Sequence, residues 1–203
     1  MLVGCGSGCN TAVSYASNIL QTLKNIKSLA LINPAGHRNS SPEDFKSIEE
    51  FAYLWDQKPF TKLPLYLALV VATYTRLKFL QQFPLKHRKH LMIHVSGFQY
   101  EVVTSDSTAI GYTSLPRLLI YSKGDRLFVN DEIMQEYTDI LGIPKSNICE
   151  CSSDGKITSP QTNNIALKGV IFDEKPDSLL LKCKGQLLLL LLDLLKTVIK
   201  KKL

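Results

Sequence analysis

Short apolar runs alternate along this chain with stretches in which apolar residues recur every three or four positions. Residues 26–33 form such a run, closed by Pro34 and Gly36, and this pattern favours a strand buried on both faces of a sheet. Residues 10–23 instead have helical spacing with one apolar stripe. Because residues 1–3 are also apolar, the chain predicts a strand, a helix and a strand in turn, which is the βαβ unit of a parallel sheet.

The same two periodicities continue through the rest of the chain. Helices are expected at residues 40–57, 63–82, 88–94, 130–141 and 179–200, and strands at residues 115–121, 167–172 and, as one short strand in a loop-rich stretch, 148–151. Strands that alternate with helices are typical of the α/β class. The helical stretch between the second and third expected strands interrupts this alternation, and it has the character of an insertion.

Composition and charge narrow the function classes. The 203 residues, 45% of them apolar, fit one domain with a sizeable core, so we expect a single domain over residues 1–203. The net charge of +6 is concentrated in residues 76–90 and 196–202. Without a nucleic-acid module or a phosphate-binding glycine loop, we expect no nucleic-acid partner, and we interpret residues 76–90 as a solvated basic face.

The five cysteines predict neither a disulfide framework nor a metal site. Their number is odd, and their spacing does not match known zinc motifs. Cys149 and Cys151 would share one face of a strand, but all four histidines precede residue 95. We therefore expect reduced thiols, no metal, no cofactor and a cytoplasmic protein.

The first ten residues, MLVGCGSGCN, carry the most specific motif. They predict a buried strand that ends in a tight turn before a helix, as in the G-x-S-x-G nucleophile elbow. Gly4 and Gly8 occupy the two flanking glycine positions, and Gly6 therefore stands where the nucleophilic serine is expected. Glycine tolerates the strained backbone of that turn, but without a hydroxyl it cannot form an acyl intermediate.

Four segments in order resemble the second half of the α/β-hydrolase fold. They are VGCGSGCNTA at the turn, SLALINPAG in the following strand, LLIYSKGDRLF in the third strand, and KGVIFDEKPDSLLLK near the end. The chain is also similar to a nematode-rich subfamily of hydrolase-fold proteins whose function is undefined. The resemblance implies a partial α/β-hydrolase fold, with a parallel sheet of about four strands that correspond to the family's fifth to eighth strands. It also implies flanking helices and a helical cap over about residues 40–113.

The family's triad carries over only in part. Asp125, after the third expected strand, occupies the position of the acid. The base position holds Ser178, or alternatively Asp177, and the chain has no histidine after His94. Because the nucleophile position holds Gly6, two of the three members are missing, and triad members act as a unit. The resemblance therefore implies a hydrolase-like pseudoenzyme, catalytically inactive, with a residual binding role.

An active serine hydrolase of ester or acyl substrates is the alternative. Ser7 would be its displaced nucleophile, with His37, His87, His90 or His94 supplying the base. In the inactive interpretation, the backbone N–H of Ser7 is better placed as an oxyanion donor than its side chain is as a nucleophile.

The resemblance also predicts an open sheet edge at which a partner could bind. A chain that starts in the family's fifth strand lacks the first four, so its first strand would have an open edge. We expect a truncated gene model, or a protein partner that takes the place of the missing N-terminal half. In the last helix, residues 187–195 are apolar except for Asp193, too short a run for a membrane span. A core helix is expected there, and a helix lying on a membrane surface, with residues 200–202 near anionic lipid, is the alternative.

Overall fold

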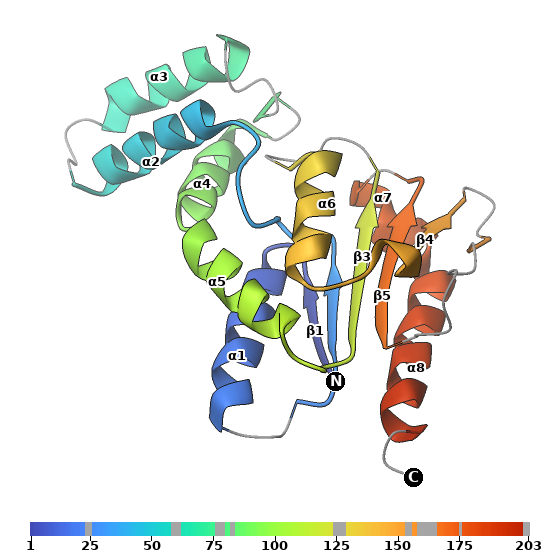
Figure 1. The fold of residues 1–203 in the computed structure, drawn as a ribbon. Helices are drawn as coiled ribbons and strands as arrows, with labels where there is room; N and C mark the ends of the chain where they lie inside the picture. Colours follow the sequence, from blue (N-terminus) through green and yellow to red (C-terminus); the bar gives the residue numbers. More distant parts are fainter. Residues whose placement is uncertain are drawn as a thin grey trace. The chain divides into compact units, whose positions relative to one another are not determined.

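The computed structural model describes residues 1–22, 26–57, 62–75, 80–81, 84–123, 129–152, 156–157, 166–174 and 176–200 (Figure 1). In chain order the elements are β1 (Leu2–Cys5), α1 (Gly8–Thr22), β2 (Leu29–Ile32), α2 (Pro42–Gln57), α3 (Lys62–Thr75), α4 (Leu85–Ser96), α5 (Tyr100–Gly111), β3 (Arg117–Ser122), α6 (Asp131–Ile140), the 3-10 turn η3 (Lys145–Asn147), β4 (Ile148–Cys151), β5 (Leu167–Phe172), α7 (Pro176–Lys182) and α8 (Lys184–Lys200). The chain divides into two compact units, Asn39–Gln99 and the remainder, Met1–Arg38 with Tyr100–Leu203.

A parallel sheet organises the larger unit. Its five strands lie in the order β1-β2-β3-β5-β4, and every pairing is parallel. The prediction of an α/β chain with a parallel sheet is confirmed, and the sheet has one strand more than the four or so that the resemblance implies. The fifth strand is β4, which pairs with β5 at the sheet edge and buries Cys149 and Cys151 on one face.

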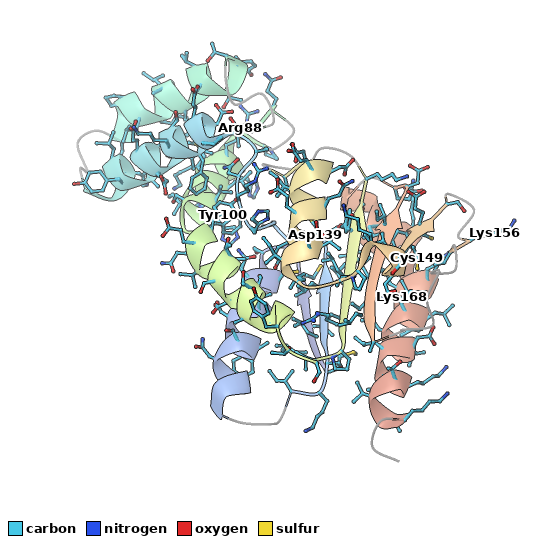
Figure 2. The ribbon with its side chains drawn as sticks, in the orientation of Figure 1. Arg88, Tyr100, Asp139, Cys149, Lys156 and Lys168 are labelled. Atoms are coloured by element: carbon cyan, nitrogen blue, oxygen red, sulfur yellow. The ribbon has the colours of Figure 1, made fainter. Side chains whose placement is uncertain are left out.

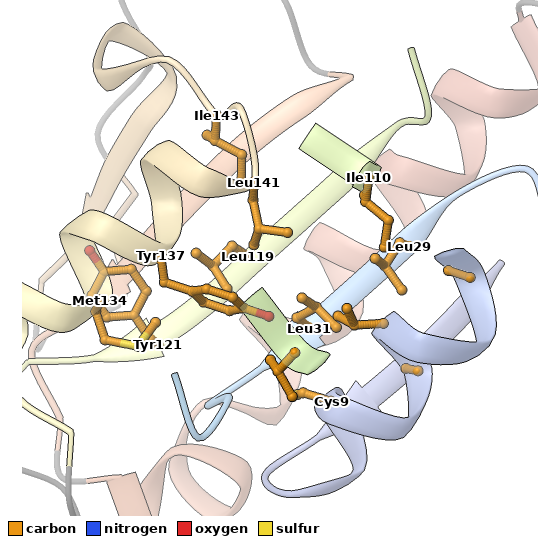
Figure 3. Close-up of a cluster of buried hydrophobic side chains, with 14 of the residues drawn as sticks. Cys9, Leu29, Leu31, Ile110, Leu119, Tyr121, Met134, Tyr137, Leu141 and Ile143 are labelled. Carbon is orange, nitrogen blue, oxygen red and sulfur yellow. The ribbon is translucent and has the colours of Figure 1, made fainter. Parts of the chain in front are cut away.

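Helices cover both faces of this sheet, as a parallel sheet requires. On one face α1, α5 and α6 pack around Leu29, Leu31 and Leu119 (Figures 1 and 3). On the other face α7 and α8 bury leucines against the opposite side chains of the same strands, such as Ile120 and Val170. β2 and β3 are buried over their whole length, which explains the continuous apolar sequence of β2 and of residues 118–121 in β3.

Two helices differ from the sequence-based prediction. The single closing helix expected at residues 179–200 is two helices, α7 and α8, which meet at Cys183. Gly185, directly after this junction, lowers the local helix propensity. The helix α5 was not predicted, because its sequence YEVVTSDSTAIG is rich in residues that disfavour helices. It packs along α1.

The smaller unit contains α2, α3 and α4, with α2 in contact with both other helices. Its buried side chains include Ile48, Phe51 and Leu69. The predicted insertion over residues 40–113 includes α5, which belongs to the larger unit. That the helices act as a cap stays a prediction.

Candidate elbow and histidine site

The turn between β1 and α1 is short, because only residues 6 and 7 separate the strand from the helix. Gly6 has a φ of 56°, in the left-handed region that glycine adopts without steric cost. Its N–H donates to the Ile32 carbonyl at 2.9 Å, and its carbonyl accepts from the Cys9 N–H at 3.1 Å. The turn is thereby fixed to the neighbouring strand on one side and to the first turn of α1 on the other.

The three glycines of the motif differ in what they require. A Cβ on Gly4 would lie 2.7 Å from the Cys9 Cα and 3.0 Å from the Ala12 Cβ, so close packing of strand and helix excludes a side chain there. A Cβ on Gly6 or Gly8 would meet no atom within 4 Å. A side chain at position 6 would therefore project into open space.

Two candidate nucleophiles lie beside Gly6. Ser7 is exposed, and its carbonyl accepts from the Asn10 N–H at 3.1 Å. Cys9 is buried, and its Sγ donates to the Ile32 carbonyl at 3.5 Å. Burial raises the pKa of Cys9 to about 12, so its thiol stays protonated at neutral pH and is a poor nucleophile.

A second sharp turn follows β2 and brings His37 toward α6. Asn33 has a φ of 47°, and its side chain accepts from the Ser122 N–H at 3.1 Å. Gly36 has a φ of 76°, and a Cβ there would lie 3.1 Å from Ile133. These contacts hold the loop tightly against β3 and α6.

His37 is 8% exposed and forms a pair with a carboxylate that sequence analysis missed. Its Nε2 lies 3.2 Å from Oε2 of Glu136, and its ring stacks on Tyr137 with the ring centres 6.0 Å apart. Thr104 donates to the His37 carbonyl at 3.0 Å. With Nε2 facing the carboxylate, Nδ1 is the second nitrogen of the ring, and it is buried without a hydrogen-bond partner among the described residues.

The charges around this pair favour a neutral imidazole. Burial lowers the pKa of His37, and this effect is larger than the opposite effect of Glu136. Arg38 donates twice to Glu136, each time at 2.8 Å, and this lowers the pKa of that carboxyl. An Nε2–H that donates to the ionised Glu136 leaves Nδ1 as the atom able to accept a proton.

Tyr137 connects the histidine loop to the buried core under the elbow. Its hydroxyl accepts from the Ser107 hydroxyl at 3.1 Å, and burial raises its pKa. Figure 3 shows the Tyr137 ring within the buried cluster that also contains Cys9, with its hydroxyl toward Leu31. The elbow and the histidine loop therefore share one packed layer.

The structure brings together only part of the predicted site. Gly6 and Ser7 lie in the expected turn. Asp125 falls outside the described residues, and Ser178 and Asp177 lie in α7 with side chains outside the described set. Glu136 is the site residue that the sequence did not reveal. The sequence predicts only the helix that contains it, and its partner His37 is about a hundred residues away in the chain.

The remaining candidate bases, His87, His90 and His94, lie on α4 in the smaller unit. Over the described part of the chain, no group of three or more His, Cys, Asp or Glu side chains is placed to hold a metal ion. Within the same residues, no helix combines the length and apolar character needed to cross a membrane.

Comparisons with family models, with curated proteins and with solved structures find no match to this chain.

Proposed function

We propose that this chain is part of an α/β-hydrolase fold without a working triad, and that it acts by binding rather than by catalysis. One observation supports the proposal: Gly6 has a left-handed backbone at the turn where the resemblance places the nucleophile, with space for a side chain and no hydroxyl to fill it. The sequence adds that no histidine follows His94, whereas the family's base comes last of the three triad residues.

An active serine hydrolase is the second candidate, and the pair of His37 and Glu136 favours it. A carboxylate that orients an imidazole is the arrangement that activates a serine. The exposed Ser7 would be its nucleophile. However, the free Nδ1 of His37 is covered by protein, so a proton transfer would first require the loop to open.

A serine-reactive fluorophosphonate probe separates the two candidates. We expect no labelling of the purified chain, and hydrolysis of p-nitrophenyl acetate no faster than with the heat-unfolded protein. Labelling that is abolished in both Ser7→Ala and His37→Gln would overturn the proposal and establish the second candidate.

A double substitution that restores both missing triad side chains tests whether Gly6 and Ser178 occupy the nucleophile and base positions. Gly6→Ser with Ser178→His should introduce labelling, at a cost in stability of about 1–2 kcal/mol because serine must adopt a left-handed φ. Gly8→Ser with Ser178→His is the matched control, because it adds the same hydroxyl two residues later in open space. Equal labelling of both variants would contradict the assignment of Gly6 as the nucleophile position.

A further inference from the structure

The helix α3 of the smaller unit is apolar on the side that faces solvent. Leu69 and Thr73 are buried, whereas Leu63, Leu67, Val71 and Tyr74 are 59 to 71% exposed. These four side chains recur at helical spacing and so form one stripe, here called the α3 stripe. Residues 63–75 contain no charged side chain. Solvent-facing helix surfaces normally carry charges, so an uncharged exposed stripe marks a site of interaction.

The sequence around this helix has one sign of charge. Neither Asp nor Glu occurs between Asp56 and Glu101. The basic residues in this interval are Lys58, Lys62, Arg76, Lys78, Lys86, Arg88 and Lys89. Lys62 at the start of α3 is exposed, whereas Arg88, labelled on α4 in Figure 2, is buried and donates to the Gln81 carbonyl. The stripe is thus set in a segment whose charge complements an anionic partner.

Trp55 lies at the same end of the unit as the first residue of α3. Its ring stacks on Phe51, and Nζ atoms of Lys62 and Lys89 lie 5.9 and 5.0 Å from its centre. Tryptophan and lysine together are characteristic of the interface between a bilayer and water, where the ring lies at headgroup level and the ammonium groups contact phosphates.

We propose that the α3 stripe rests on the surface of a lipid bilayer that contains anionic lipids. The apolar side chains would enter the boundary between headgroups and acyl chains, while Lys62 and Lys89 would neutralise lipid phosphates. The helix lies along the surface and does not cross it. The stripe belongs to the smaller unit, whereas the turn at Gly6 and the histidine pair belong to the larger one, and the proposal does not depend on the presence or absence of catalysis.

Two features favour a bilayer over other anionic partners. A nucleic acid would meet the basic residues but would leave the exposed leucines of the stripe in water. A second copy of this chain would cover the leucines but would bring the same acid-free basic segment against itself. A bilayer with anionic lipids satisfies both the apolar and the charged component.

Trp55 is the only tryptophan, so its emission reports directly on this surface. With vesicles of phosphatidylcholine and phosphatidylserine, we expect the full chain to float with the lipid and its emission to shift to shorter wavelength. With phosphatidylcholine alone, binding should be much weaker. Lys62→Gln with Lys89→Gln should weaken binding about 25-fold, since each basic residue near such a surface contributes about fivefold.

The stripe itself is tested with a matched pair of variants. Leu67→Glu with Val71→Glu changes side chains that are 59 and 62% exposed, and it should abolish flotation and the emission shift. Leu188→Glu with Leu189→Glu on α8 introduces the same two negative charges at leucines that are as exposed as Leu67 and Val71. This variant should bind vesicles as the native chain does. Circular dichroism confirms that each variant keeps its helices.

Several outcomes overturn the proposal. Absence of flotation with phosphatidylserine vesicles does so directly. Loss of binding in the α8 pair but not in the α3 pair would assign the membrane surface to the last helix. A dimer in size-exclusion chromatography that only the α3 pair disrupts would make a second copy the occupant. Binding to an RNA oligonucleotide without binding to vesicles would make the partner a nucleic acid.

Discussion

At the residue scale, the candidate site depends on three residues with left-handed backbone. Gly6, Asn33 and Gly36 all have positive φ and all follow the carboxyl ends of β1 and β2. Each turns the chain sharply at the sheet edge where parallel α/β proteins bind ligands. Asn33 is not a glycine, and its strain of about 1 kcal/mol is offset by the hydrogen bonds that its N–H and side chain make to β3.

The pKa of His37 predicts how stability depends on pH. Because burial lowers this pKa below the ordinary value of 6.5, the unfolded chain binds the proton more tightly than the folded chain. The stability that neutral His37 contributes is present above pH 6.5 and is lost as the pH falls from 6.5 to the lower pKa of the folded state. His37→Gln keeps a donor for Glu136 but cannot titrate.

Urea unfolding from about pH 7.5 to about pH 5.5 measures this effect, because histidine titrates in that interval. As the pH is lowered, the free energy of unfolding should decrease in the native chain and decrease less steeply in His37→Gln. Parallel profiles for the two proteins would show that His37 is not the titrating group.

The candidate site was only partly predictable from the sequence. Position 6 could be found because glycines at spacing two, after an apolar run, leave few structures other than a tight turn. The pair of His37 and Glu136 could not be found, because it depends on how a loop and a helix far apart in sequence pack together. For Asp125 and Ser178, the predictions rest on the resemblance alone.

At the element scale, a single buried arginine holds the end of α5. The guanidinium of Arg117, on β3, donates to the carbonyls of Ile110, Gly111 and Thr113. Ile110 and Gly111 are the last two residues of α5, whose carbonyls have no partners within the helix itself, and Thr113 lies just beyond it. Burial lowers the pKa of Arg117 to about 10, so it remains charged at neutral pH.

Arg117→Met should therefore lower the free energy of unfolding by about 3 kcal/mol, because the carbonyls of Gly111 and Thr113 lose the guanidinium donor, whereas that of Ile110 keeps the N–H and hydroxyl of Thr113. Arg38→Met is the matched control: its ion pair with Glu136 is about half exposed, and such surface pairs contribute about 0–1 kcal/mol. Urea titrations followed by circular dichroism compare the two. Equal losses would mean that Arg117 does not support α5.

The fold was more predictable at this scale than the site. Every expected strand is present, because runs such as 29–32 are apolar, short and bounded by polar residues. The helix α6 was also expected, and Asn130 caps it by accepting from the Ile133 N–H at 2.9 Å. The helix α5 has Ser107 rather than an aliphatic residue at a buried position, which hides its apolar stripe in the sequence.

At the scale of the whole molecule, β1 forms one end of the sheet. Among the described strands it pairs only with β2, and Met1 and Val3 are 47 and 44% exposed. Such an edge can pair with a strand of another molecule, and natural proteins often protect edges with lysine. A protein partner or further strands at this edge stay a prediction.

Val3→Lys should therefore reduce self-association, seen as lower light scattering on concentration. It should change the free energy of unfolding by only about 0.5 kcal/mol, because the side chain is largely exposed. Tyr15→Lys adds the same charge on α1, where the side chain is 54% exposed, and it should scatter as the native chain does. A similar decrease in both variants would indicate a general charge effect and not the strand edge.

The cysteines of this chain differ in a way that has a practical consequence. Cys5, next to the turn at Gly6, is exposed, whereas Cys9, Cys149, Cys151 and Cys183 are all buried. A thiol reagent added to the folded protein meets one accessible sulfur, and a dye or spin label can be attached there without replacing the other four. Movement of the turn could then be followed in an otherwise native protein, from a reporter one residue away from its bend.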